Sequence, residues 1–309
     1  MEKPVRDLSI DKDTSLAELA EAYHEAGGFV AKKVGQAVEI LKEMTEQAEV
    51  RFLSFPAALV STGTRGLLKD LVKAKHVDII MTTCGTLDHD FARVWKDYLH
   101  GSFQDDDVQL HKEKTHRLGN IRIPEEAYGQ IIEKKLQPML TDMVENGKRS
   151  LSTHEFVWEI GRRLETEPRK EESIIYWAWK HQIPMIIPGI TDGAFGLQLL
   201  MFMQDHPDFQ VDVWKDEKFL MEKMFGDIKT GALMIGGGIS KHHTIWWNQF
   251  AEGLNWAVYI TTAPEWDGSL SGARIREGIS WGKVNEQARF VTLEGDATVL
   301  LPLVVGPLL

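Results

Sequence analysis

Lys283 is the residue of this sequence best suited to act as a nucleophile. It follows Trp281 at the end of a long, glycine-rich and aromatic stretch that begins at Trp266. A lysine among apolar and aromatic side chains is more easily neutral, because desolvation disfavours the ammonium. A neutral lysine can attack an electrophilic carbon and form an imine. The alternative interpretation is an ordinary lysine in a surface loop, which composition does not exclude.

A second set of residues stands where several predicted strands end. Glycine lets a ligand approach the backbone closely, and free N–H groups at helix starts favour phosphate. Asp192 and Asp296 are placed to accept hydrogen bonds from ribose hydroxyls. Each loop alone is better explained as a simple strand end, but together they predict a dinucleotide at the edge of a parallel sheet. The chain has no G-x-G-x-x-G or Walker A motif, so the standard fingerprint is not used. The loops are Thr83-Cys84-Gly85-Thr86, Gly189-Ile190-Thr191-Asp192-Gly193, Gly236-Gly237-Gly238, Thr262-Ala263 and Gly295-Asp296-Ala297.

The histidine, aspartate and cysteine pattern does not predict a metal site. Adjacent histidines such as His242 and His243 point to different sides of a helix and chelate one ion poorly. The Asp88-His89-Asp90 run is better explained as a polar helix start. Cys84 is the single cysteine, so it forms neither an internal disulfide nor a thiolate cage, and a reducing cytoplasm is the expected compartment.

The elements that must position these residues alternate between helix and strand. This alternation predicts an α/β fold, a parallel sheet with helices on both faces. No composition break divides the chain, so residues 1–309 are expected to form one large domain. Residues 100–121 lack clear periodicity and are expected to be a long functional loop. Strands are predicted at 51–59, 77–83, 184–188, 209–213, 232–235, 257–261 and 290–293, and helices at 15–25, 29–44, 67–75, 125–145, 153–164, 173–181, 195–204, 217–225, 243–254 and from 297 onward.

Composition excludes some classes of partner. Lys and Arg number 35 against 46 Asp and Glu, a net charge of −11, which argues against nucleic-acid binding. An acidic field would instead attract a cationic ligand or a basic protein. The N-terminus lacks a signal-peptide pattern, and the apolar stretch 297–309 is too short to span a membrane. Trp246-Trp247 on one helix hints at a contact between subunits.

Several of these stretches, taken in order, resemble the deoxyhypusine synthase family. The resemblance rests on a series of motifs rather than on any one of them, and it covers nearly the whole chain. The motifs are Thr82-Thr83, Arg117-Leu118-Gly119-Asn120, Thr191-Asp192-Gly193, Gly236-Gly237-Gly238-Ile239-Ser240-Lys241-His242-His243, Ala257-Val258-Tyr259-Ile260-Thr261-Thr262-Ala263, Asp267-Gly268-Ser269, Ser271-Gly272-Ala273-Arg274 and Ser280-Trp281-Gly282-Lys283.

The resemblance implies a fold, a reaction and an assembly. The fold would be Rossmann-like, and the enzyme a cytoplasmic homotetramer with active sites at dimer interfaces. With NAD as cofactor, such an enzyme oxidises spermidine to an imine. The aminobutyl group then passes to an enzyme lysine and on to one lysine of translation initiation factor 5A, and the hydride returns.

The resemblance also implies roles for individual residues. Lys283 would carry the aminobutyl group and His242 would line the polyamine pocket. Trp281 would pack against the methylenes of the substrate and Glu277 would hold an amine. Asp88, His89, Gly268 and Ser269 are the further predicted substrate contacts. The implied NAD contacts are Ser61, Thr83, Cys84, Gly85, Asp192, Gly237, Thr262, Ala263, Asp296 and Ala297.

Three positions depart from the pattern of the family. His89, Leu197 and Leu270 stand where an acidic residue of the polyamine pocket is expected. A cationic polyamine needs carboxylates to replace its water shell, so their loss argues for a changed substrate. Two alternatives therefore stay open. One is a relative that moves an aminoalkyl group between other amines, as homospermidine synthase does, and the other is a non-catalytic paralogue that binds NAD.

Overall fold

The computed structural model describes residues 3–309 of the chain. The chain divides into two compact units, and each unit is made of separate stretches of sequence. Unit 1 comprises the residues up to Phe55, Ala74–Met81 and Leu220–Leu309, and unit 2 comprises Pro56–Lys73 and Thr82–Phe219. The expectation of one domain over residues 1–309 stays a prediction.

A parallel sheet with strand order β11-β10-β9-β1-β2 forms the centre of unit 1. Every residue of β9 is buried, which explains the nearly continuous apolar run of its sequence. The predicted α/β class with a parallel sheet is confirmed. The strands are β1 (Val50–Ser54), β2 (Ile79–Met81), β9 (Thr230–Ile235), β10 (Leu254–Thr261) and β11 (Val284–Glu294).

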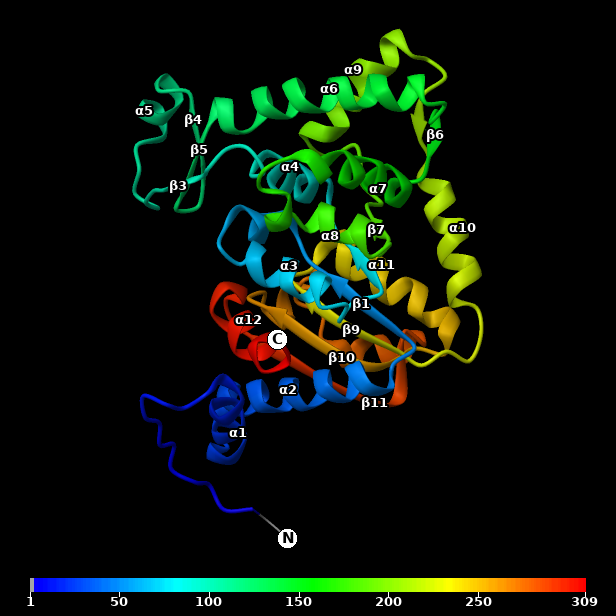
Figure 1. The fold of residues 1–309 in the computed structure, drawn as a ribbon. Helices are drawn as coiled ribbons and strands as arrows, with labels where there is room; N and C mark the ends of the chain where they lie inside the picture. Colours follow the sequence, from blue (N-terminus) through cyan, green and yellow to red (C-terminus); the bar gives the residue numbers. More distant parts are fainter. Residues whose placement is uncertain (1–2) are drawn as a thin grey trace. The chain divides into compact units, whose positions relative to one another are not determined.

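Helices cover both faces of this sheet, as the alternating pattern predicts. Helix α2 (Phe29–Gln47) packs against β9, β10 and β11, and α12 (Ala297–Val305) packs beside it against β10. Helix α11 (Gly238–Asn248) packs against β9, β1 and β2. Figure 1 shows α2 and α11 on opposite sides of the strands. Helix α1 (Leu16–Ala26) packs on α2 and begins with a capping box between Ser15 and Glu18.

Two predicted strands in unit 1 differ most from the structure in their boundaries. The strand predicted at 51–59 ends at Ser54, because Pro56 follows and a short 3-10 helix begins at Ala57. The strand predicted at 290–293 is the much longer β11, which begins at Val284. The first half of β11 is largely exposed and polar, so the run of apolar residues predicted only the last part of the strand. Lys283 therefore directly precedes a strand instead of lying within a loop.

Unit 2 is mostly helical. Helix α4 packs against α6, α8 and α9, and α7 packs against α8. The strand predicted at 209–213 is the short β8 (Gln210–Val211), which pairs with β6 (Ser150–Leu151) in a separate small sheet. The helices are α3 (Arg65–Lys73), α4 (Cys84–Ala92), α5 (Asp107–Lys112), α6 (Gly129–Glu145), α7 (Thr153–Arg163), α8 (Ile174–Lys180) and α9 (Ala194–Asp205). The strand predicted at 184–188 is β7 (Met185–Ile186), and α10 (Val213–Met224) contains the boundary between the units.

The expected loop at residues 100–121 has regular secondary structure instead, and its expected functional role stays a prediction. This segment contains α5 and most of a three-stranded antiparallel sheet of order β3-β5-β4 (Figure 1). The strands are β3 (Leu99–His100), β4 (Thr115–Leu118) and β5 (Ile121–Pro124). Two arginine–aspartate pairs, Arg122–Asp105 and Arg117–Asp107, tie the connection to the strands. Strands this short and this polar have almost no apolar periodicity to detect.

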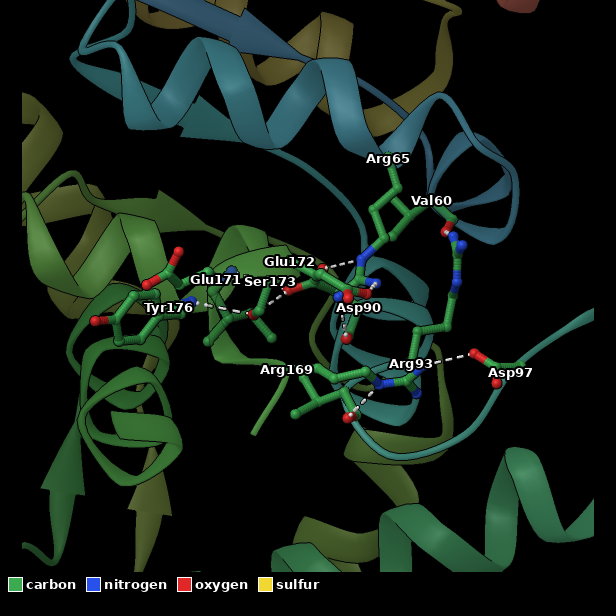
Figure 2. A network of polar contacts seen from close by, with 12 residues as sticks. Val60, Arg65, Asp90, Arg93, Asp97, Arg169, Glu171, Glu172, Ser173 and Tyr176 are labelled. Atoms are coloured by element: carbon green, nitrogen blue, oxygen red, sulfur yellow. Dashed lines mark hydrogen bonds and ion pairs between the residues drawn. The ribbon is translucent and has the colours of Figure 1, made fainter. Parts of the chain in front are cut away.

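A buried ion pair fixes α4 within unit 2. Arg65 Nε donates to Asp90 Oδ1 at 2.7 Å, and the two side chains are 4% and 0% exposed. The second oxygen of Asp90 accepts from Ser173 Oγ at 2.7 Å and from the backbone N–H of Ile175 at 2.9 Å. Figure 2 shows this network, in which Arg93 also reaches the carbonyl of Val60. The pair therefore joins the start of α3 and the start of α8 to the helix that carries Cys84, Gly85 and Asp88.

Candidate active site

The connection from β10 to β11 supplies most of the predicted substrate residues in unit 1. It contains a 3-10 helix over Ile275–Trp281, which ends at Gly282 with a φ of 68°. A side chain at Gly282 would be strained in this left-handed conformation, so glycine lets the chain turn sharply into β11. The N–H of Lys283 then donates to the Gly278 carbonyl at 2.9 Å. This turn fixes the backbone of Lys283 at the strand start.

Lys283 is buried, with 9% of its surface exposed. Its Nζ lies 5.1 Å from the ring centroid of Trp281 and 5.6 Å from that of Trp246 on α11. Both distances are within the range of cation–π attraction. The structure thus places the predicted nucleophile beside two indoles.

A cavity of about 350 Å³ opens beside Lys283, with all its lining residues in unit 1. Most of its wall is apolar, and the described lining residues include one carboxylate, that of Glu277. Such a wall suits a methylene chain, and the carboxylate suits a terminal amine. The charged, polar and large side chains at the cavity include Lys241, His242, Trp246, Leu270, Arg274, Glu277, Trp281 and Lys283.

His242 lies in the same cavity near the start of α11. Its ring stacks on Trp246, with centroids 6.0 Å apart and an interplanar angle of 23°. Burial lowers the pKa of His242, and the positive charge of Lys283 lowers it further. The imidazole is therefore neutral near pH 7 and able to accept a proton. Trp246 was not among the predicted pocket residues, although its spacing of four from His242 on a helix puts both on one face.

Lys241 is a second lysine at this cavity, and it is held differently. Its Nζ donates to the carbonyls of Leu270 at 2.9 Å and Ala273 at 2.6 Å. It also lies 3.9 Å from the ring centroid of Tyr259. Burial lowers the pKa of Lys241 to about 8. Low pKa alone would nominate Lys241 as nucleophile, but its protons are engaged by two carbonyls and the side chain is packed inside the protein.

Arg274 and the turn around Gly268 hold the rest of the connection. Arg274 Nη1 donates to the carbonyls of Ala263 at 3.2 Å and Gly272 at 3.0 Å. Gly268 has a φ of 69°, and the N–H of Ser269 donates to Asp267 Oδ1 at 2.7 Å. Hydrogen bonds from the hydroxyl and the N–H of Ser269 lower the pKa of Asp267. Gly268 and Ser269 thus shape a tight turn, and their predicted contact with substrate stays a prediction.

The strand ends of β9, β10 and β11 lie side by side in unit 1. Gly236 donates to the Ile260 carbonyl at 2.8 Å, and Gly295 donates to that of Thr261 at 2.9 Å. The predicted residues Gly237, Thr262, Ala263, Asp296 and Ala297 therefore share one edge of the sheet. A side chain at Gly237 would meet Ser271, because an ideal Cβ would lie 2.2 Å from Ser271 Oγ. The close approach of Ser271 therefore requires glycine at position 237, whether or not a cofactor also approaches it.

The predicted substrate residues Asp88 and His89 lie in unit 2. Asp88 is fully buried and accepts from Tyr128 Oη at 2.7 Å and from the N–H groups of Ala194 and Phe195 at 2.9 and 2.8 Å. It thereby caps the start of α9, while burial raises its pKa. His89 Nδ1 lies 2.9 Å from Tyr98 Oη. Burial, with a smaller contribution from Arg93, lowers the pKa of His89 to about 4.

The other predicted NAD contacts, Ser61, Thr83, Cys84, Gly85 and Asp192, are also in unit 2. Ser61 Oγ donates to the Ala58 carbonyl at 2.7 Å, and Thr83 Oγ1 accepts from the Ala57 N–H at 3.2 Å. Cys84 is fully buried, which raises the pKa of its thiol to about 12. This thiol is therefore not reactive near neutral pH. Gly85 approaches Ala57, since an ideal Cβ would lie 2.9 Å from that of Ala57.

Within residues 3–309, histidine, cysteine, aspartate and glutamate form no group of three or more that could hold a metal ion. None of the helices described there is long and apolar enough to cross a membrane.

The fold and the site define a class: an α/β protein with a Rossmann-like parallel sheet and a buried lysine in an aromatic cavity. Comparison with known proteins identifies the family. Residues 18–308 match the deoxyhypusine synthase family model. A "Probable deoxyhypusine synthase" from Picrophilus torridus is 52% identical over 309 residues, covering 100% of this chain and 98% of the relative. One from Thermoplasma acidophilum is 50% identical with the same coverage. The chain belongs to the deoxyhypusine synthase family.

A solved structure supports the fold independently. The crystal structure of a "putative deoxyhypusine synthase" from Entamoeba histolytica superposes with a TM-score of 0.67. It covers 98% of this chain and 96% of its own, at 21% sequence identity. At this identity the match bears on the fold alone.

Proposed function

We propose that this chain is a deoxyhypusine synthase that uses NAD to transfer the aminobutyl group of spermidine to a lysine of translation initiation factor 5A. The observation that carries the proposal is the setting of Lys283. It is buried and close to Trp246 and Trp281, at a cavity that His242 and Glu277 also line. Family membership supports the same reaction class, a transferase.

The residues of the cavity would divide the work of binding and transfer. Glu277 would bind a terminal ammonium of the substrate, and the indole of Trp281 would cover its methylenes. NAD, when bound, would accept a hydride from the amine and return it at the end to the imine carbon that then joins the transferred group to the acceptor lysine. Lys283, after losing its proton, would attack the resulting imine carbon, and the remaining diamine would leave as the carbon–nitrogen bond to it breaks.

The second half of the reaction would reverse the roles of the two amines. The lysine of the acceptor protein would attack the imine carbon held by Lys283, and the Lys283 nitrogen would depart. His242 is neutral near pH 7 and would accept or return a proton in these exchanges. The buried, aromatic setting would limit hydrolysis of the imine by excluding water.

The strand edge of unit 1 fits part of a dinucleotide. Helix α11 begins at Gly238 without a side-chain cap, which leaves N–H groups free for a phosphate. Gly238 has a φ of 71° and open space where a Cβ would lie. Asp296 is exposed at the end of β11 on the same sheet edge, where a carboxylate could accept from ribose hydroxyls. Gly237, Thr262, Ala263 and Ala297 would complete this edge.

The decisive experiment incubates the protein with NAD, labelled spermidine and factor 5A from the same source. Mass spectrometry of the acceptor should find the aminobutyl label on one lysine. Label transfer that also occurs without NAD would contradict the proposed chemistry. Absence of transfer with NAD bound would favour a non-catalytic paralogue.

A different amine donor or acceptor is the second candidate, and Leu270 is the observation that favours it. Leu270 lines the cavity with an apolar side chain, and Glu277 alone provides a carboxylate among the described lining residues. A long cation with several charges would be poorly neutralised there. Competition between spermidine and shorter diamines in the same assay separates the two candidates. Transfer from a diamine but not from spermidine would favour the aminoalkyl transferase of the homospermidine-synthase type.

We propose further that the enzyme is a homotetramer. Trp246 is 42% exposed, and a large aromatic surface of this kind often marks a contact between subunits. Sedimentation equilibrium at micromolar concentration should give the tetramer mass. A chain that sediments as a monomer would contradict the proposal.

A further inference from the structure

The ammonium of Lys241 lies at the centre of a cluster that binds backbone carbonyls. It donates to Leu270 O and Ala273 O, and it lies over the ring of Tyr259. Only 2% of this lysine is exposed, so water does not replace these partners. The two carbonyl acceptors and the aromatic face offset part of the cost of burying this cation.

Side chains of β10 bind the carbonyl of Ser271, which lies between Leu270 and Ala273 in the sequence. Ser271 O accepts from Tyr259 Oη at 2.6 Å and from Thr261 Oγ1 at 3.0 Å. Side chains from α11 and β10 thus bind the carbonyls of residues 270, 271 and 273. This segment, which we term the clamped loop (residues 270–273), is held against the helix and the strand by side chains that are not its own.

We propose that Lys241 is a positioning residue that holds the clamped loop in place and so shapes the cavity wall facing Lys283. Leu270 and Ala273 line that cavity directly, and Arg274 and Glu277 follow in the same connection. If the clamp were released, the wall and the carboxylate of Glu277 would lose their fixed distance from Lys283. The activity part of this inference rests on the proposed function, whereas the structural part does not.

The geometry explains why a lysine is needed at this position. A methionine of similar length would leave the carbonyls of Leu270 and Ala273 buried without a donor, which is costly. An arginine keeps the charge and offers more donors, so it should retain part of the clamp. Comparing Lys241→Met with Lys241→Arg therefore distinguishes the effect of losing the hydrogen-bond donors and the charge from the effect of changing the shape of the side chain.

Charge at this position is also expected to matter. Burial lowers the pKa of Lys241 to about 8, while Glu277 favours and Arg274 opposes its charged form. Above that pH the amine keeps hydrogen-bond donors but loses its charge and its attraction to the Tyr259 ring. The clamp should therefore weaken as pH rises through 8 in the wild type. In Lys241→Arg the guanidinium stays charged, so this weakening should be absent.

Hydrogen exchange tests the clamp without any assay of activity. In Lys241→Met, amides at residues 269–274 should exchange about tenfold faster, because a hydrogen bond of ordinary strength is lost. Lys223→Met, which alters an exposed lysine of unit 1, is the matched control and should leave this segment unchanged. Unchanged exchange in a folded Lys241→Met protein would overturn the proposal. If that variant does not fold, faster exchange of the same segment in wild type at pH 9 than in Lys241→Arg is the equivalent result.

Kinetics with the amine donor then test the consequence for the site. We expect KM for the amine to rise about tenfold in Lys241→Met, with partial rescue in Lys241→Arg, because loss of the clamp disturbs binding before chemistry. An amine adduct trapped on Lys241 by borohydride would overturn the positioning role. A wild-type protein with no transfer activity would refute the proposed function and leave the exchange result to decide on the clamp.

Discussion

Removing the charge of Asp90 tests whether the buried network of unit 2 holds α4 in place. The carboxylate of Asp90 is 0% exposed and accepts from Arg65, Ser173 and the Ile175 backbone (Figure 2). In Asp90→Asn the amide cannot accept at both ends, and the 4% exposed guanidinium of Arg65 loses its buried counter-charge. Breaking one partner of a buried pair typically costs about 3–5 kcal/mol of unfolding free energy.

A matched control comes from the same network. Asp97 pairs with Arg169 at 2.6 Å, but its side chain is 78% exposed. Asp97→Asn should therefore cost less than about 1 kcal/mol, because an exposed pair is screened by solvent. Urea denaturation of both variants, followed by tryptophan fluorescence and by circular dichroism, measures the difference.

Replacing both partners gives a third comparison. In the Arg65→Met, Asp90→Leu double variant neither buried charge of the pair is left without the other, so part of the loss should be recovered. Recovery should be incomplete, since Ser173 and the Ile175 N–H still lose their acceptor. An Asp90→Asn protein as stable as Asp97→Asn would refute the reasoning, because it would show that the pair adds nothing to the fixing of α4.

Three other outcomes can be checked directly. Lys283→Arg should abolish transfer while NAD still binds, because arginine does not lose its proton. Borohydride with NAD and spermidine should trap an adduct on Lys283 in wild type and none in the variant. An adduct on Lys241 would identify a different nucleophile. Asp296→Ala should weaken NAD binding by about 1–3 kcal/mol in isothermal titration, and unchanged affinity would remove Asp296 from the site. The pKa of His89 is lowered to about 4 in the folded protein, so the unfolded chain binds a proton first as pH falls. Stability should therefore fall between about pH 6.5 and 4 by a few kcal/mol, and His89→Gln should flatten this dependence in pH-dependent urea melts.

Local sequence patterns were sufficient to predict the fold class and the family. The continuous apolar runs of β9 and β10, and the helical spacing before and after them, predict a parallel sheet because such strands are buried on both faces. A capping box at Ser15 and a glycine before Lys283 act through neighbouring residues, so their effects are readable from short stretches. The strands β3, β4 and β5 were missed because they are short and largely polar, so their sequences show almost no apolar periodicity.

The different roles of Lys241 and Lys283 could not be predicted from such local patterns. Lys241 and Lys283 both stand beside candidate loops, and residue type alone makes either a nucleophile. Folding brings Leu270 and Ala273 to the first and the rings of Trp246 and Trp281 to the second. Contacts between residues 29 to 37 positions apart decide which amine is engaged by carbonyls and which faces a cavity. Burial and hydrogen bonding, which set the reactivity of an amine, are properties of that three-dimensional neighbourhood and not of the local sequence.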